Sequence, residues 1–146
     1  SYILSNTDSI SDAISKSDLV IGSVYVVGKE APKVITKDML KVMKPGSVLV
    51  DISIDQGGCV ETSRPTTHDD PVFIEDGVVH YCVTNMPGAV PLTASLALNQ
   101  ATLPYIEKIA NLGFSQALKE DLHLANGLNM ADGIVKHDSV IAALNN

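Results

Sequence analysis

One carboxylate stands at a place in the sequence where it could do chemistry. Asp55 follows an apolar run and precedes two adjacent glycines, Gly57 and Gly58. A carboxylate at the end of such a run can orient a water molecule, accept a hydrogen bond from a ribose hydroxyl, or balance a developing positive charge. The alternative is a structural carboxylate that stabilises the loop by accepting hydrogen bonds from nearby backbone N–H groups. The residue type and its neighbours leave both interpretations open.

Two other polar side chains lie in comparable loops. Asn85 precedes Met86 and Pro87, where its amide could bind a carboxamide group or cap the turn. Arg64 lies in a polar loop, and its guanidinium could bind phosphate or pair with Glu61. Each of these residues therefore has both a binding and a structural interpretation.

The histidines, and the lack of several known catalytic motifs, disfavour some types of reaction. His68 precedes Asp69 and Asp70, but adjacent carboxylates need not face one ion, so we predict no metal site. His80 falls in a predicted strand and is interpreted as structural. The sequence contains no GxSxG elbow, Walker loop or HExxH motif, which disfavours hydrolase and phosphate-transfer functions.

The elements that must position these residues alternate between short apolar runs and helical periodicity. This alternation is typical of an α/β fold with a parallel sheet, whose interior strands are apolar on both faces. Predicted strands are residues 18–22, 47–52, 72–74 and 78–83, the last two joined by a tight turn, and predicted helices are residues 8–15 and 36–43. Asp8 or Ser9 would cap the first helix and Thr36 the second.

Each of three predicted strands ends in a polar or small segment. Ligands of open parallel sheets lie beyond the carboxyl ends of the strands. We therefore expect residues 22–25, 52–56 and 83–86 to converge on one cleft, although any single break could be an ordinary connecting loop.

The pattern changes near residue 90. From there about twenty residues are helical, with Pro91 in the first turn and Pro104 expected to kink the helix. Residues 114–121 and 138–144 are predicted helices, and residues 127–137 are predicted to form two short extended segments.

Composition excludes several classes of partner. A net charge of -7 disfavours nucleic acid, and the longest apolar stretch is interrupted by polar side chains, so no membrane span is expected. Cys59 and Cys82 lack CxxC spacing and are interpreted as free thiols of a reducing compartment. With no signal peptide visible, we expect a cytoplasmic protein. The start at Ser1, without Met, suggests that further chain precedes it.

Three segments resemble the alanine dehydrogenase family strongly, and the similarity extends from about residue 5 to the end. They are residues 44–59 (KPGSVLVDISIDQGGC), 61–68 (ETSRPTTH) and 80–88 (HYCVTNMPG). The sister family, the NAD-binding subunit of proton-translocating transhydrogenase, shares residues 31–33 and 44–46. It normally lacks the DQGGC and SRPTT runs, so the resemblance favours alanine dehydrogenase.

The resemblance implies a cofactor and a set of site residues. The cofactor would be NAD, with L-alanine, pyruvate and ammonium as substrates, and Asp55 would be the catalytic aspartate. Ser5 would approach the adenosine side. The remaining cofactor-binding positions would be Val24, Tyr25, Ile52, Ser53, Ile54, Asp55, Arg64, Val83, Thr84, Asn85 and Met86.

The resemblance also implies the domain organisation. Residues 1–87 would be the second half of a Rossmann-type NAD-binding domain, and residues 88–146 a long helix returning to part of the substrate domain. The glycine-rich pyrophosphate loop and the family's N-terminal catalytic residues do not occur in this sequence. We therefore expect this chain to be inactive alone, to need the N-terminal part of the protein, and to assemble as a homo-oligomer, by resemblance a hexamer. The alternatives are a non-catalytic nucleotide-binding module or a transhydrogenase subunit.

Overall fold

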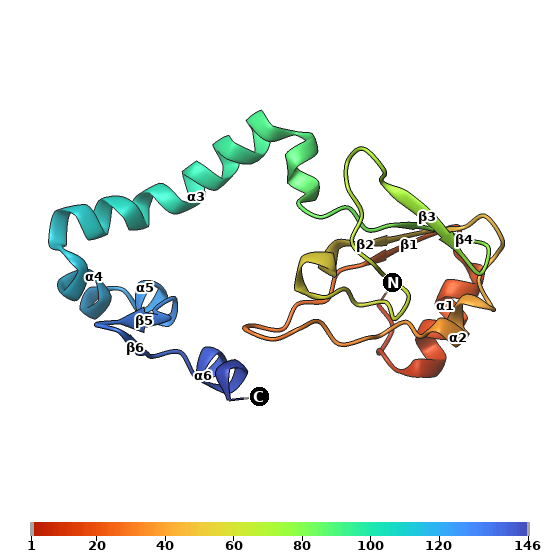
Figure 1. The fold of residues 1–146 in the computed structure, drawn as a ribbon, viewed down its shortest axis with the longest axis horizontal. Helices are drawn as coiled ribbons and strands as arrows, with labels where there is room; N and C mark the ends of the chain where they lie inside the picture. Colours follow the sequence, from red (N-terminus) through yellow and green to blue (C-terminus); the bar gives the residue numbers. More distant parts are fainter. Residues whose placement is uncertain (1, 146) are drawn as a thin grey trace. The chain divides into compact units, whose positions relative to one another are not determined.

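The computed structural model describes residues 2–145, which form two compact units that divide between residues 86 and 87. The first unit contains a four-stranded sheet with the strand order β1-β2-β4-β3. Its strands are β1 (Leu19–Gly22), β2 (Val48–Asp51), β3 (Val72–Glu75) and β4 (Val78–Tyr81). β1, β2 and β4 are parallel, whereas β3 runs antiparallel to β4 (Figure 1). The predicted α/β class with a mostly parallel sheet is confirmed.

The turn between β3 and β4 follows from its two central residues. Asp76 and Gly77 both have positive φ angles, of 47° and 78°. Two consecutive left-handed residues match the right-handed twist of the paired strands, and Asp-Gly is a favoured pair for this conformation. The predicted tight turn is therefore present.

Two helices of the first unit differ in detail from the prediction. α1 (Thr7–Lys16) is capped by Asn6, whose side chain accepts from the Ser9 N–H while the Ser9 hydroxyl accepts from the Asn6 N–H. Neither Asp8 nor Ser9 is the cap residue. α2 (Lys37–Leu40) is shorter than predicted, and Glu61 from a distant loop accepts its first N–H, at 2.7 Å from the Lys37 nitrogen. The Thr36 side chain makes no capping bond.

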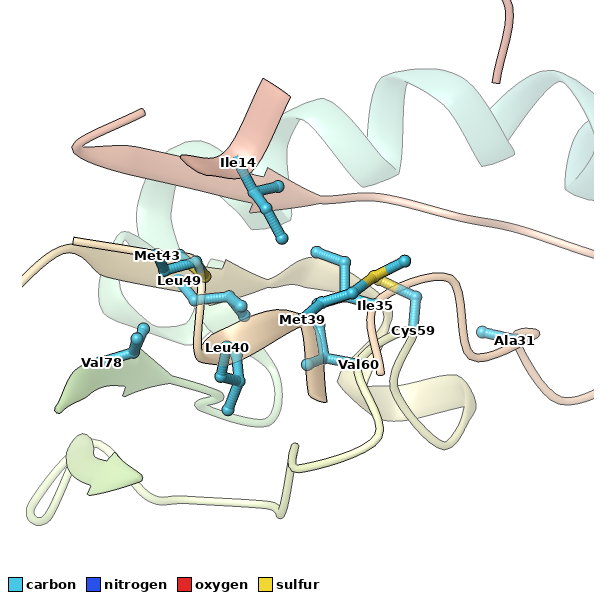
Figure 2. Packing of buried hydrophobic residues seen from close by; sticks show 10 residues of the cluster. All are labelled: Ile14, Ala31, Ile35, Met39, Leu40, Met43, Leu49, Cys59, Val60 and Val78. Carbon is cyan, nitrogen blue, oxygen red and sulfur yellow. The ribbon is translucent and has the colours of Figure 1, made fainter. Parts of the chain in front are cut away.

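The core of the first unit lies between the sheet and these two helices. Figure 2 shows Ile14 of α1 pointing toward the side chains of α2 and β2, among them Met39 and Leu49. Leu40 and Leu49 are almost wholly buried. Burying a side chain of this size stabilises a fold by about 1.5–3 kcal/mol, so this packing holds the strands whose ends carry the polar residues.

β1 departs from the expectation of a strand buried on both faces. It lies at an edge of the sheet, and Leu19 and Ile21 are 56% and 57% exposed. Gly22 and half-buried Val20 face the opposite way, toward the core side. Within residues 2–86, therefore, only one face of β1 is covered.

The second unit is mainly helical. Its helices are α3 (Pro91–Leu112), α4 (Phe114–Glu120), α5 (Leu122–Asn126) and α6 (Asp138–Leu144), and β5 (Met130–Ala131) pairs with β6 (Ile134–Val135). The short helix η2 (Met86–Ala89) precedes α3. The predicted extended pair is confirmed, whereas α5 was not predicted. Pro104 lies inside α3, which is continuous across it. Within residues 2–145, no helix is both long enough and apolar enough to cross a membrane.

Candidate functional site

The segments that follow β1 and β2 are joined by a reciprocal pair of hydrogen bonds. Ser53 lies in the 3-10 helix η1 (Ile52–Gln56), which begins directly after β2. The Val24 N–H donates to the Ser53 hydroxyl at 2.7 Å, and that hydroxyl donates to the Val24 carbonyl at 2.9 Å. Strand β2 was predicted to continue through residue 52, but it ends at Asp51 because η1 turns the chain there.

The segments that follow β2 and β4 are joined through Asp55. Its Oδ2 accepts from the backbone N–H of Asn85 at 3.3 Å. Asn85 has a φ of 52°, a left-handed conformation that asparagine adopts more readily than most residues. Together with the bond pair between Val24 and Ser53, this contact confirms that the three predicted strand ends lie side by side.

Asp55 itself is exposed on η1. Its single hydrogen-bond partner among the described residues is the backbone N–H of Asn85, in the loop after β4, so one carboxylate oxygen has the structural role that the alternative describes. The other carboxylate oxygen forms no hydrogen bond within residues 2–145. Asp55 can therefore accept a proton or a hydrogen bond from a bound molecule.

A second carboxylate, which the sequence did not single out, lies beneath this turn. Asp51 is 0% exposed at the end of β2. Its oxygens accept from five donors: the N–H groups of Ser53 (3.0 Å), Cys59 (2.9 Å) and Val60 (3.2 Å), the Ser63 hydroxyl (2.6 Å) and the Cys59 thiol (3.4 Å). A charged residue inside an otherwise apolar run was the available signal, because a buried carboxylate must find donors.

Two glycines allow the chain to approach this buried carboxylate. A Cβ on Gly58 would lie 2.9 Å from Asp51 Oδ2, and the φ of Gly58 is +76°. A Cβ on Gly22 would lie 2.5 Å from the Cys59 sulfur. Side chains at these positions would displace the groups that surround Asp51.

Both cysteines are buried free thiols beside the same carboxylate. Burial, followed by the charge of Asp51, raises the pKa of Cys59. Burial also raises the pKa of Cys82, with a smaller contribution from Asp51. Since only thiolates are strong nucleophiles, neither cysteine is suited to nucleophilic catalysis.

The other sequence-predicted site residues fall into exposed and buried groups. Tyr25 and Ile52 are 68% and 48% exposed next to Asp55's turn, so they offer apolar surface. Val24, Thr84 and Met86 are half-buried, whereas Ser53, Ile54 and Val83 are buried. Ser5 is exposed in the segment before α1. In residues 2–145 no hydrogen bond joins it to the Asp55 cluster.

Arg64 and His68 extend from the loop between η1 and β3. The Arg64 guanidinium lies 4.1 Å from the centre of the Phe73 ring, which in turn stacks on His80. Glu61, the proposed partner of Arg64, instead caps α2. His68 Nε2 lies 3.1 Å from the Asn85 carbonyl oxygen, so this imidazole helps to hold the turn that contacts Asp55. Nowhere in the described chain do three His, Cys, Asp or Glu side chains gather as metal ligands.

The segments after the strands present groups that could contact a ring that bears an amide. Ile52 and Tyr25 supply exposed apolar area, and the side-chain amide of Asn85 is exposed beside Asp55. A nicotinamide ring has both an apolar face and a carboxamide that exchanges hydrogen bonds with such groups. The donors and acceptors present therefore suit the nicotinamide part of a dinucleotide.

Comparison with known proteins gives a consistent match. The family described as "Alanine dehydrogenase/PNT, C-terminal domain" matches residues 1–138. An alanine dehydrogenase of Halomonas elongata is 55% identical over 141 residues, which are 97% of this chain and 38% of that protein. One from Staphylococcus haemolyticus is 53% identical over 142 residues, also 97% of this chain and 38% of that protein.

Solved structures show the same similarity. The structure of an L-alanine dehydrogenase superposes with a TM-score of 0.82 at 48% identity, covering 97% of this chain and 39% of that one. The structure of a transhydrogenase from Sinorhizobium meliloti gives a TM-score of 0.69 at 26% identity, covering 92% of this chain and 36% of that one. This chain thus spans less than two fifths of the length of these relatives.

Proposed function

Because the chain belongs to the alanine dehydrogenase/PNT family through its C-terminal domain, we propose that it is the C-terminal part of an NAD-dependent alanine dehydrogenase. The reaction would be the reversible oxidative deamination of L-alanine to pyruvate and ammonium. One observation carries the proposal: the exposed Asp55 carboxylate lies where the segments after β1, β2 and β4 meet. The higher identity to alanine dehydrogenases than to the transhydrogenase supports this choice.

The proposal assigns a role to each unit. Residues 1–87 would form the second half of a Rossmann-type domain, with the nicotinamide at the carboxyl ends of its strands. Residues 88–146 would carry the chain through α3 toward the substrate domain. The glycine-rich pyrophosphate loop and the groups that bind the substrate carboxylate would come from the rest of the protein. We therefore propose that residues 1–146 alone do not turn over alanine.

The cofactor-binding assignments rest on where the side chains lie. Tyr25, Ile52 and Asn85 expose side chains that could contact the nicotinamide. Ser53, Ile54 and Val83 are buried, so they would shape the cleft through the backbone. The half-buried Val24, Thr84 and Met86 would line its sides, and Ser5 would lie toward the adenosine. The Arg64 guanidinium lies over the Phe73 ring, so its side chain would have to change conformation, or the dinucleotide would have to extend to this ring, for the two to meet.

NAD+, when bound, supplies the acceptor for the hydride that leaves the α-carbon of alanine. Alanine reacts with a neutral amino group, after one proton of its ammonium group has passed to solvent, so loss of the hydride leaves an iminium whose positive charge the Asp55 carboxylate stabilises. The Asp55 oxygen that does not bind the Asn85 N–H then accepts a proton from the water that attacks this carbon. Asp55 then gives this proton to the nitrogen of the carbinolamine, the C–N bond breaks, and the hydroxyl proton passes to the departing ammonia, which leaves pyruvate and ammonium. In the reverse direction the same steps run backward, and Asp55 gives its proton to the hydroxyl group that leaves as water.

The test uses the full-length protein. With L-alanine and NAD+ it should produce NADH and pyruvate in equal amounts, and with pyruvate, ammonium and NADH it should run backward. Hydride exchange between NAD(H) and NADP(H) without alanine turnover would instead identify a transhydrogenase subunit. Nucleotide binding with neither activity would support the non-catalytic module.

The setting of the protein is part of the proposal. Cys59 and Cys82 are buried free thiols, as expected of a protein in a reducing compartment, so we place it in the cytoplasm. Assembly as a homo-oligomer, a hexamer by analogy with the family, can be measured by light scattering of the full-length protein.

A further inference from the structure

The buried carboxylate of Asp51 has no part in the reaction proposed above. It is 0% exposed and therefore touches neither solvent nor a bound substrate. No basic side chain forms an ion pair with it in the part of the chain that the structure describes. Its burial is compensated by five donors, three of them backbone N–H groups. A buried carboxylate requires such partners, and these five donors show which parts of the chain Asp51 holds together.

These hydrogen bonds hold both ends of the turn that carries Asp55. Before the turn, Asp51 Oδ1 accepts from Ser53. After the turn, Asp51 Oδ2 accepts from Cys59, Val60 and the hydroxyl of Ser63. One carboxylate thus closes the segment between residues 51 and 60, with Asp55 between the two anchored ends.

The backbone of the turn reinforces this closure. The Gly57 N–H donates to the Ile54 carbonyl at 3.0 Å, and the Gly58 N–H to the Ser53 carbonyl at 2.9 Å. Lys33 donates to the Gly58 carbonyl at 2.8 Å. Gly58 can approach Asp51 only because it has no Cβ. The turn is therefore assembled around the carboxylate.

We propose that Asp51 is a positioning residue, whose carboxylate fixes η1 so that the Asp55 side chain faces the reacting carbon. The inference rests on the proposed function of Asp55. A displacement of about 1 Å at a reacting group lowers a rate by roughly a hundredfold, so an anchor that prevents it is essential to turnover.

Asparagine is the informative replacement because it keeps the shape of the side chain and removes one acceptor. Its NH2 group would face donors that Asp51 satisfies on both oxygens, either Ser53 and the Cys59 thiol or Cys59, Val60 and Ser63. Donors would then oppose donors, and one anchored end of the turn would be released.

The experiment measures steady-state kinetics of the full-length protein with L-alanine and NAD+. We expect Asp51→Asn to lower kcat by about 10- to 100-fold and to change the KM for NAD+ by less than about twofold. The matched control is Val78→Ala, which also creates a defect in the buried core. Val78 begins β4, at the end of the strands away from Asp55, so this variant should keep the kcat of the wild type.

A double variant separates positioning from general loosening. If Asp51 acts through Asp55, adding Asp51→Asn to Asp55→Asn should lower kcat by less than about threefold further, because the group that it positions is already lost. Independent effects would multiply and would overturn the inference. Should Asp51→Asn not fold, Ser63→Ala removes one donor to the same carboxylate and should lower kcat about 3- to 10-fold with the same non-additivity.

Hydrogen exchange supplies a readout that does not depend on activity. The amides of Ser53, Cys59 and Val60 should exchange at least tenfold faster in Asp51→Asn than in the Val78→Ala control. Unchanged exchange, or an unchanged kcat in an active enzyme, would overturn the positioning role alone. A wild-type protein without alanine oxidation would instead overturn the proposed function, and the exchange rates would still show whether Asp51 holds the turn.

Discussion

Replacing Asp55 by asparagine tests the chemistry with little change in the fold. The side chain is exposed, and its one hydrogen bond to residues 2–145 comes from the Asn85 N–H at 3.3 Å. The amide oxygen of an asparagine can accept the same bond. Asp55→Asn should therefore preserve the turn and remove only the negative charge and the ability to take up a proton.

The size of the effect follows from Coulomb's law. A carboxylate about 4 Å from an iminium stabilises it by about 1 kcal/mol in bulk water and about 4 kcal/mol at the effective dielectric constant of a protein surface. These limits correspond to a rate loss of roughly fivefold and roughly a thousandfold. In the proposed function water is excluded around the bound alanine, and an asparagine at position 55 cannot act as a base. We therefore expect kcat to fall by about 100- to 1000-fold.

The assay is NADH formation by the full-length protein, together with a titration of NAD+ binding. Affinity for NAD+ should change by less than about threefold, because the attraction between the positively charged nicotinamide and an exposed carboxylate is weak. Asp12→Asn is a suitable control because it removes another exposed carboxylate, one that lies on α1 and pairs with Lys16. Wild-type turnover in Asp55→Asn would remove Asp55 from the mechanism.

Two further predictions concern stability and can be measured on the chain itself by chemical denaturation. Gly58→Ala should lower the free energy of unfolding by about 1–3 kcal/mol because of its positive φ, and by a further amount because the new Cβ displaces Asp51. The control is Gly46→Ala, since Gly46 has a φ of +82° and open space around it, and this variant should lose less stability. Equal losses in the two variants would show that Asp51 does not limit position 58. Because burial raises the pKa of Cys59 and Cys82, the folded state holds their protons more tightly than the unfolded state. Their contribution to stability is complete below pH 9.0, the ordinary value for the thiol, and is lost as the pH rises through the higher folded value. Between pH 9.0 and the ordinary lysine value of 10.5, the double variant Cys59→Ala, Cys82→Ala should lose less free energy of unfolding than the wild type. The same pH dependence in both proteins would contradict the argument.

The convergence of the strand ends could be predicted because it depends on topology alone. Parallel strands present their carboxyl ends at one edge, so apolar runs followed by polar breaks were enough to bring Val24, Asp55 and Asn85 together. The Asp-Gly turn was predictable from local backbone preferences. What Asp55 and its neighbours bind is a separate question, on which the geometry supports a proposal.

Features that depend on contacts distant in sequence could not be predicted. Asp51 occurs in an apolar pattern, and its donors lie up to twelve residues farther along the chain. The first N–H of α2 is capped by Glu61 rather than by Thr36 beside it, and no local rule gives such a partner. The cap of α1 is a different case, because Asn6 and Ser9 have the spacing of a capping box that the sequence already contained.

The reciprocal bonds between Ser53 and Val24, with the bond from Asn85 to Asp55, link the three segments that follow β1, β2 and β4. Separation of the segment after β1 from η1 would break both hydrogen bonds of Ser53. A displacement of η1 would also move Asp55 and strain its hydrogen bond from Asn85. A contact that held one of the three segments in place would therefore also restrict the movement of the other two.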